Sequence, residues 1–271
     1  MMRLLGFAAA VLLCLAAPAR AEEDEAARAA RWQDLKHAVF GDRPVLDGSA
    51  VVSLDAPVRA LDAATVPIGV SLAADGPIAG KVTAIWLLVD GNPSPLAGVF
   101  RFGPGGDPRS LRARVRVDQY TLIHAVAETE DGQLYAAERY VKAAGGCSAP
   151  SSKDPQVAMS RLGQMRLRLD SETPPVEGGT VTATLLISHP NNNGMQMDQL
   201  THNYIPPRYI QDITVDYGAE RVLSVESDIS LSEDPVITFG LRVHGPGPLR
   251  ADVRDSTDAA FHQEFPILNR S

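Results

Sequence analysis

The feature that most limits how this chain can fold is a series of short apolar runs with a period near two. The clearest is Leu-Arg-Ala-Arg-Val-Arg-Val at 111–117, which alternates apolar and basic residues as a half-buried antiparallel strand does. Asp-Gly-Asn-Pro at 90–93 and Glu-Asp-Gly at 130–132 supply turns between neighbouring runs. The pattern predicts antiparallel hairpins, with strands at 66–72, 85–89, 96–102, 111–117, 120–128 and 133–141.

The same pattern returns in the second half of the chain. Each half has about the 100 residues and the six or seven short strands that an immunoglobulin-like sandwich requires. Residues 143–155 between the halves are small or turn-forming and indicate a linker. The strands of the second half are expected at 165–169, 180–188, 209–217, 221–227, 236–243, 249–253 and 261–267.

One helix is expected before the first strand. Trp32, Leu35 and Val39 recur at a helical spacing that ends at Gly41. The fold class is therefore predicted to be all-β: two immunoglobulin-like antiparallel β-sandwich domains in tandem, with one N-terminal amphipathic helix.

The first 21 residues are typical of a cleavable secretory signal. Arg3 gives the basic start, residues 4–17 form an apolar stretch too short to span a bilayer, and Ala-Arg-Ala at 19–21 matches a cleavage site. We therefore expect export to an oxidising compartment. The predicted organisation is a signal peptide at 1–21, a first domain with its helix at 22–142, a linker at 143–157 and a second domain at 158–271.

Composition and motifs exclude several classes of function. A formal charge of −8 gives no general electrostatic attraction to nucleic acid or anionic lipid. The sequence has no G-x-S-x-G, H-E-x-x-H, paired-cysteine or Walker motif, and no two histidines stand four residues apart. His124, inside an expected strand, is interpreted as a histidine packed against the sheet. We predict no enzyme activity, no metal and no cofactor.

Cys147 is the residue most suggestive of chemistry. Cleavage of the signal removes Cys14 and leaves Cys147 as the single thiol, which makes an intramolecular disulfide impossible. A lone cysteine is usually buried as a small apolar side chain. Gly145 and Gly146 favour the alternative, a mobile and reactive thiol, because two glycines leave the backbone free. The long polar stretch at 189–208 is expected to be a loop, and such loops are often functional.

These residues resemble a known family. The strand that ends in Val-Lys-Ala-Ala-Gly-Gly-Cys at 141–147 resembles SoxY, the subunit of a sulfur-oxidising carrier whose thiol lies in a glycine-flanked terminal arm. The second half is similar to the partner subunit SoxZ in Met-Arg-Leu-Arg-Leu at 165–169, Leu-Leu-Ile-Ser-His-Pro at 185–190 and Phe-His-Gln-Glu-Phe at 261–265. The whole resembles the fused, quinoprotein dehydrogenase-associated SoxYZ-like carriers. The family's arm ends the chain in Gly-Gly-Cys-Gly-Gly, whereas Cys147 is followed by Ser-Ala-Pro and a second domain.

The resemblance implies a periplasmic carrier of sulfur oxidation, such as thiosulfate oxidation, that holds a sulfur compound covalently on Cys147. Gly145 and Gly146 would make the arm flexible, and periplasmic sulfur-oxidising or quinoprotein dehydrogenase enzymes would be the partners. The alternative is a binding or assembly module for a periplasmic quinoprotein alcohol dehydrogenase, with the thiol incidental. For a carrier, we expect the two sandwiches to pack through an apolar interface that leaves residues 143–155 exposed.

Overall fold

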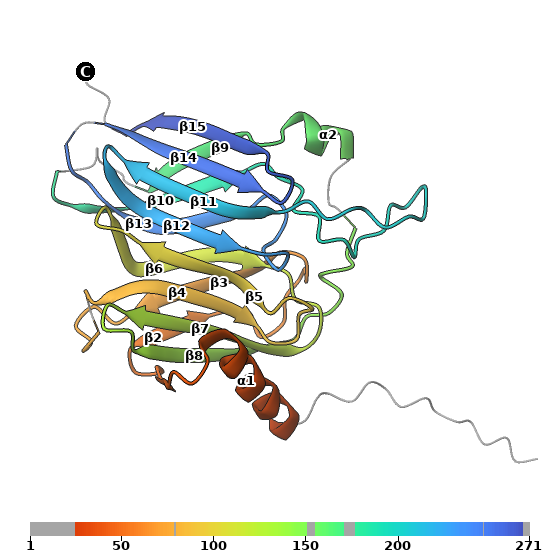
Figure 1. Cartoon of the computed structure of the whole chain (residues 1–271), viewed down its shortest axis with the longest axis horizontal. Helices are drawn as coiled ribbons and strands as arrows, with labels where there is room; N and C mark the ends of the chain where they lie inside the picture. Colours follow the sequence, from red (N-terminus) through yellow and green to blue (C-terminus); the bar gives the residue numbers. More distant parts are fainter. Residues whose placement is uncertain (1–24, 79, 151–154, 171–176, 246, 268–271) are drawn as a thin grey trace, which may run out of the picture.

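The computed structural model describes residues 25–78, 80–150, 155–170, 177–245 and 247–267 (Figure 1). The predicted signal peptide at 1–21 lies outside these residues. None of the helices in the described part of the chain is long and apolar enough to cross a membrane. The elements are α1 Glu25–Phe40, β1 Val45–Asp47, β2 Val52–Asp55, β3 Val66–Leu72, β4 Val82–Val89, β5 Leu96–Phe102, β6 Gly106–Val115, β7 Thr121–Thr129, β8 Leu134–Val141, α2 Pro155–Ser160, β9 Met165–Asp170, β10 Thr180–Ile187, β11 Ile210–Tyr217, β12 Glu220–Ser227, β13 Val236–Arg242, β14 Pro248–Asp255 and β15 Ala260–Pro266.

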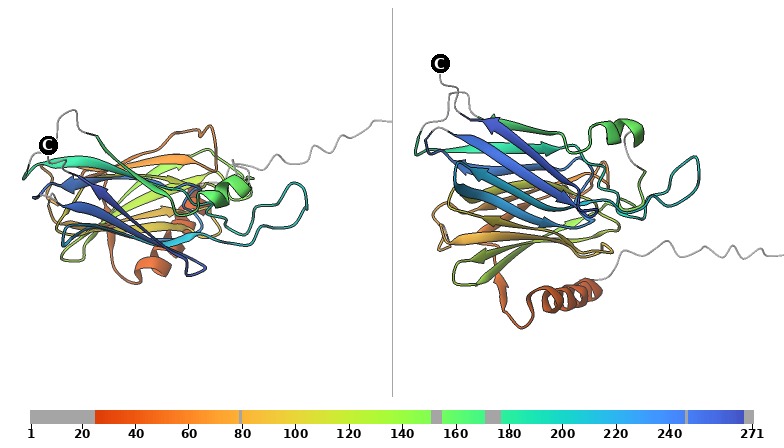
Figure 2. Two further views of the ribbon diagram at one scale, coloured as in Figure 1. Left: turned by 90° about the horizontal axis from the view of Figure 1, so that it is seen from above. Right: turned by 45° about the horizontal axis from the view of Figure 1, so that its top comes forward.

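The strands form two stacked sheets, which Figure 2 shows as two layers. The larger sheet has the order β1-β8-β7-β4-β5-β12-β11-β14-β15, and the smaller has the order β2-β3-β6-β13-β10-β9. The prediction of an all-β sandwich with one N-terminal helix is confirmed. Every strand expected from the sequence is present, with ends shifted by a few residues.

The short elements β1, β2 and α2 were not expected. Three or four residues of strand give too little alternation to recognise, and β1 pairs in parallel with β8 rather than in a hairpin. A six-residue helix is likewise too short to show a helical period.

Both sheets run without a break through the two halves of the chain. In the larger sheet β5 pairs antiparallel with β12, and in the smaller sheet β6 pairs antiparallel with β13. The two sandwiches are therefore joined edge to edge by backbone hydrogen bonds, and this line of contact is called the seam below. Pairing at the seam covers the strand edges that each half would otherwise expose.

A single apolar core lies between the sheets and continues across the seam. It includes Phe100 and Leu111 from the first half and Val225 and Phe239 from the second. The expected apolar contact between the halves is thus present, but strand pairing accompanies it.

The helix α1 covers the outer face of the larger sheet, below β7 and β8 in the view of Figure 1. Its Trp32, Leu35 and Val39 pack around a small separate cluster formed by Phe40, Leu88, Val126 and Leu134. These are the helical positions that the sequence pattern selected, so the prediction of an amphipathic helix is confirmed.

Candidate functional site

Cys147 lies in a turn after β8 that packs against the segment following β6. The Gly145 N–H donates to the carbonyl oxygen of Asp118 at 2.8 Å, and the Gly146 N–H donates to that of Val117 at 3.0 Å. Cys147 itself is only 1% exposed. The turn therefore encloses the thiol within the protein.

The expectation that residues 143–155 are exposed is wrong at the thiol itself. Ala143, Gly146 and Cys147 are buried, whereas Ala144, Ser148 and Pro150 are exposed. The glycines were interpreted as a source of mobility, but at Gly146 the missing Cβ has another consequence. A Cβ there would overlap the carbonyl oxygen of Ala63, so glycine lets the turn pack directly on neighbouring backbone.

The polar loop of the second half holds this turn in place. The side-chain amide of Asn193 donates from Nδ2 to the carbonyl oxygen of Cys147 at 2.7 Å. Asn193 is itself fixed, because its backbone N–H donates to Oε1 of Gln196 and its Oδ1 accepts from the N–H of Met195. The loop expected at 189–208 therefore contacts the backbone of Cys147 directly.

Arg116 is buried beside the turn, at the seam. Its Nη2 donates to the carbonyl oxygen of Asn191 at 2.9 Å, and its backbone N–H donates to the carbonyl oxygen of Ser230. Asn92 donates to the carbonyl oxygen of Arg116 at 2.7 Å and to Oγ of Ser230 at 2.8 Å. Residues from both halves of the chain thus build the surroundings of Cys147. We call Cys147, Arg116, Asp118, Asn191 and Asn193 the seam site.

Electrostatics at the seam site keep the thiol neutral. Burial raises the pKa of Cys147 to about 12, and the carboxylate of Asp118 adds to this rise. The guanidinium of Arg116 acts in the opposite direction but does not compensate. Because the thiolate is the nucleophile, Cys147 is unreactive while the turn is closed.

A buried histidine supports the asparagine loop. Nδ1 of His189 accepts the Asn191 N–H at 3.0 Å, and Nε2 donates to Asp255 at 3.3 Å. Asp255 also accepts from Nε of Arg208 at 2.8 Å. Burial lowers the pKa of His189 despite the carboxylate of Asp255, so the neutral ring that can accept from Asn191 is favoured.

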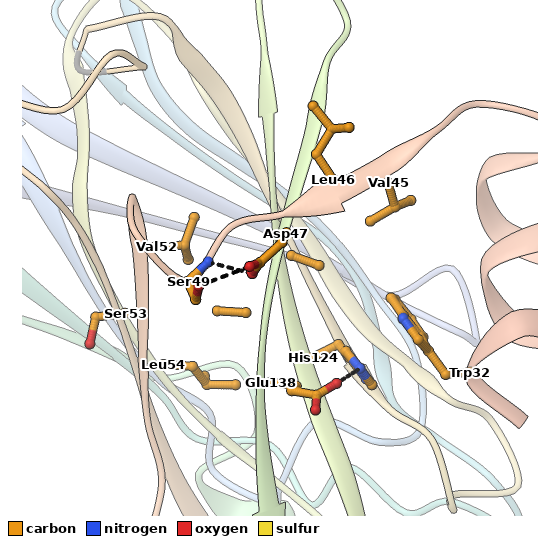
Figure 3. Close-up of a pocket in the computed structure, with 12 residues that line it drawn as sticks. Trp32, Val45, Leu46, Asp47, Ser49, Val52, Ser53, Leu54, His124 and Glu138 are labelled. Carbon is orange, nitrogen blue, oxygen red and sulfur yellow. Dashed lines mark hydrogen bonds and ion pairs between the residues drawn. The ribbon is translucent and has the colours of Figure 1, made fainter. Parts of the chain in front are cut away.

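A second polar cluster, centred on the buried His124, lies under α1 (Figure 3). His124 contacts Asp90 at 2.9 Å and Glu138 at 3.0 Å, and its ring stacks on Trp32 with centroids 3.6 Å apart. These residues, apart from Asp90, line a pocket of about 570 Å³. Both ring nitrogens have partners, as the interpretation of a packed histidine requires. Within the described part of the chain, no group of three His, Cys, Asp or Glu side chains is placed to hold a metal ion.

Sequence reasoning found part of the seam site. It selected Cys147 and the polar loop, and the run of asparagines at 191–193 was a visible signal of amide hydrogen bonding. It missed Arg116, which continues the alternation of Arg112 and Arg114. Nothing in that pattern distinguishes the buried arginine from the two exposed ones.

Two families match the chain in tandem. The sequence model of sulfur oxidation protein SoxY matches residues 36–147, and that of sulphur oxidation protein SoxZ matches residues 169–266. No curated protein matches the chain.

Several solved structures are similar to this chain. The sulfur carrier protein SoxY from Chlorobium limicola f thiosulfatophilum is 28% identical, with 43% of this chain and 94% of that chain covered and a TM-score of 0.35. A glycosyl hydrolase family 2 member from Bacteroides cellulosilyticus is 10% identical, with 85% of this chain and 30% of that chain covered and a TM-score of 0.23.

Proposed function

Because a SoxY-like sequence and a SoxZ-like sequence are joined in this one polypeptide, we propose that the protein is a carrier of sulfur oxidation that binds a sulfur compound covalently on Cys147. The observation that carries this proposal is the SoxY match, which ends at Cys147 itself. The protein is a carrier rather than a catalyst, and partner enzymes load and release the compound by exchange at the sulfur.

The buried thiol requires that the turn opens before loading. Three hydrogen bonds hold it, from Gly145, Gly146 and Asn193. At about 1 kcal/mol net for each bond, opening costs about 3 kcal/mol, so roughly one molecule in 100 to 1,000 is open at any time. Such a minor state is sufficient for slow exchange, and a partner that binds the open turn would increase its population.

Export to the periplasm through the signal peptide at 1–21 belongs to the same proposal. A periplasmic quinoprotein dehydrogenase is one partner that we propose, beside enzymes of sulfur oxidation. The oxidising compartment suits a carrier whose cargo is a disulfide, persulfide or thiosulfonate.

The experiment measures intact mass after the native protein is incubated with thiosulfate and an oxidant. We expect an adduct on the wild type and none on Cys147→Ser. Equal adducts on both proteins, or a native wild type that remains unmodified, would contradict the proposal.

The burial of Cys147 favours a second candidate, a protein-binding module in which the thiol is incidental. The two candidates predict different outcomes for the variant Cys147→Ser. In a deletion strain, Cys147→Ser restores sulfur oxidation and dehydrogenase activity fully if the protein is a module, and fails to restore them if it is a carrier. An equal amount of folded protein in both strains is the control.

A further inference from the structure

Arg116 is buried where the sequence pattern would leave it exposed. Arg112 and Arg114 alternate with apolar residues on β6 and are exposed, whereas Arg116, the next basic residue in the series, is 1% exposed. The loop of the second half covers it, and Nη2 of Arg116 donates to the carbonyl oxygen of Asn191. A permanently charged group has thus been removed from water.

One nitrogen of the buried guanidinium lacks a hydrogen-bond partner. Its Nε has no hydrogen-bond partner, and none of the ion pairs among the described residues includes Arg116. Glu233 and Asp62 interact with it electrostatically without forming such a pair. A buried charge without a paired anion is costly, and removing the anion from a buried pair destabilises a protein strongly. Arg116 is therefore a buried cation that lacks a directly paired anion.

Cys147 lies beside Arg116, because the Gly146 N–H donates to the carbonyl oxygen of Val117, the residue after Arg116. Arg116 acts to lower the pKa of Cys147, and Cys147 in its ionised form would favour the charged Arg116. In the closed turn the thiol is neutral, so it gives Arg116 no anion. The carboxylate of Asp118 repels a negative charge on the sulfur atom. An anion at this site must therefore bind Arg116 strongly enough to overcome that repulsion.

We infer that Arg116 binds the sulfonate end of a sulfur adduct on Cys147, so that the closed turn shelters a charged adduct. A guanidinium matches planar and tetrahedral oxyanions with parallel N–H donors, and charge-assisted hydrogen bonds are about twice as strong as neutral ones. Gln196, whose Nε2 is buried without a partner in the same loop, is a second donor near the turn. This inference rests on the proposed function, because it assigns Arg116 as the residue that binds the cargo of that same site.

Tetrathionate loads such an adduct without a separate oxidant. The thiolate of Cys147 attacks an inner sulfur of tetrathionate, a new S–S bond forms, and the old central S–S bond breaks. Thiosulfate leaves with the electron pair of that bond, and the thiol proton goes to solvent. The product is Cys147 joined through a disulfide sulfur to a sulfonate. Methyl methanethiosulfonate gives a neutral control, a methyl disulfide on the same sulfur.

The experiment loads both adducts in denaturant, refolds the protein and confirms occupancy by intact mass. Dithiothreitol then releases each adduct, and each native rate is divided by the rate in denaturant to remove intrinsic reactivity. We expect the sulfonate adduct of the wild type to be protected roughly tenfold more than the methyl adduct, as one charge-assisted hydrogen bond provides. Arg116→Gln should abolish this difference, and Arg114→Gln, which removes an exposed arginine two residues earlier on β6, should retain it.

Equal protection of the two adducts in the wild type, or an unchanged difference in Arg116→Gln, would overturn the inference. Should Arg116→Gln not fold, the thermal midpoints of the two loaded wild-type forms decide, because sheltering requires the sulfonate form to melt higher. Failure of the proposed function looks different: the native protein then takes up no adduct in the absence of denaturant, whatever residue stands at 116.

Discussion

Gly145 and Gly146 shape the turn of Cys147 through two different physical requirements. Gly145 has a φ of +79°, a left-handed conformation that side chains with a Cβ rarely adopt, and an added Cβ there would meet nothing closer than 3.9 Å. Gly146 has the opposite limitation, because its added Cβ would overlap the Ala63 carbonyl oxygen. One glycine permits the backbone angle, and the other permits the close approach that buries the thiol.

We predict that Gly146→Ala opens the turn. Overlap with backbone costs about 1 to 3 kcal/mol, so the open population and the reaction of Cys147 with a small thiol reagent should rise about tenfold. Gly145→Ala should cost about 1 to 2 kcal/mol for its φ and also speed the reaction. The wild-type thiol should react at least about 100-fold more slowly in the native state than in denaturant.

The matched control is Gly178→Ala, which has a φ of +81° and open space around its Cβ. It carries the same conformational penalty as Gly145→Ala but does not touch the seam site. A rise in thiol reactivity equal to that of Gly145→Ala would show that global stability, rather than the turn, controls access to Cys147.

Hydrogen bonds in the loop between β10 and β11 connect His189 to Arg116, which lies beside the turn of Cys147. His189 accepts the N–H of Asn191, and Asn191 accepts Nη2 of Arg116 on its carbonyl oxygen. Asn191 has a φ of +45° and is fully buried, so its conformation depends on these bonds. Protonation of Nδ1 of His189 would remove the acceptor for the Asn191 N–H.

We predict that His189 lowers stability as the pH drops below 6.5, whereas His124, whose pKa its hydrogen bonds to Asp90 and Glu138 raise despite burial, acts in the opposite direction. The pKa of His189 is lowered in the folded state, so the unfolded chain binds more protons in this window and unfolding becomes easier. Asp255 at 3.3 Å, Arg208 beyond it and Asp234, which accepts the His189 N–H, are the charged groups that face it.

The measurement is urea unfolding at pH 7.5, 6.5 and 5.5. His189→Gln should show a smaller loss of unfolding free energy across this range than the wild type. His262→Gln, at an exposed strand position, serves as the control and should follow the wild type. Identical pH slopes for His189→Gln and the wild type would refute the assignment.

Because both sheets are continuous, the two halves of the molecule should unfold together as one cooperative unit. Backbone pairing at the seam and a shared core connect the SoxY-like and SoxZ-like halves, so each half stabilises the edge strands of the other. If one half were produced alone, its seam strands would have unpaired backbone groups and would tend to aggregate. The site at Cys147 exists only when both halves are folded, because each half contributes residues to it.

We predict that a core substitution far from the seam in the second half also lowers the stability of the first half. Leu249 on β14 is fully buried, and Leu249→Ala should cost about 2 to 5 kcal/mol. Both tryptophans, Trp32 and Trp86, lie in the first half, so their fluorescence reports on that half alone. We expect the fluorescence and circular-dichroism midpoints to shift together, as in a two-state transition.

Leu200→Ala is the control for this experiment, because Leu200 is 92% exposed and should shift neither midpoint. A fluorescence midpoint that stays constant in Leu249→Ala would mean that the halves unfold independently despite the seam.

Much of the fold follows from the order of residues along the chain. Alternation and turn residues specify the strands, since a strand exposes one face and buries the other wherever it lies. Trp32, Leu35 and Val39 specify the helix for the same kind of local reason. Cys147 stood out because it is the single thiol after the predicted signal peptide and follows two glycines.

Only the tertiary structure decided which of these residues meet and which are buried. The pairing of β5 with β12 and of β6 with β13 brings together strands far apart in the chain, and local periodicity carries no information about such partners. The burial of Arg116 and Cys147 has the same origin. Their exposure depends on a loop more than 40 residues away in sequence, whose hydrogen bonds to both form only in the folded chain.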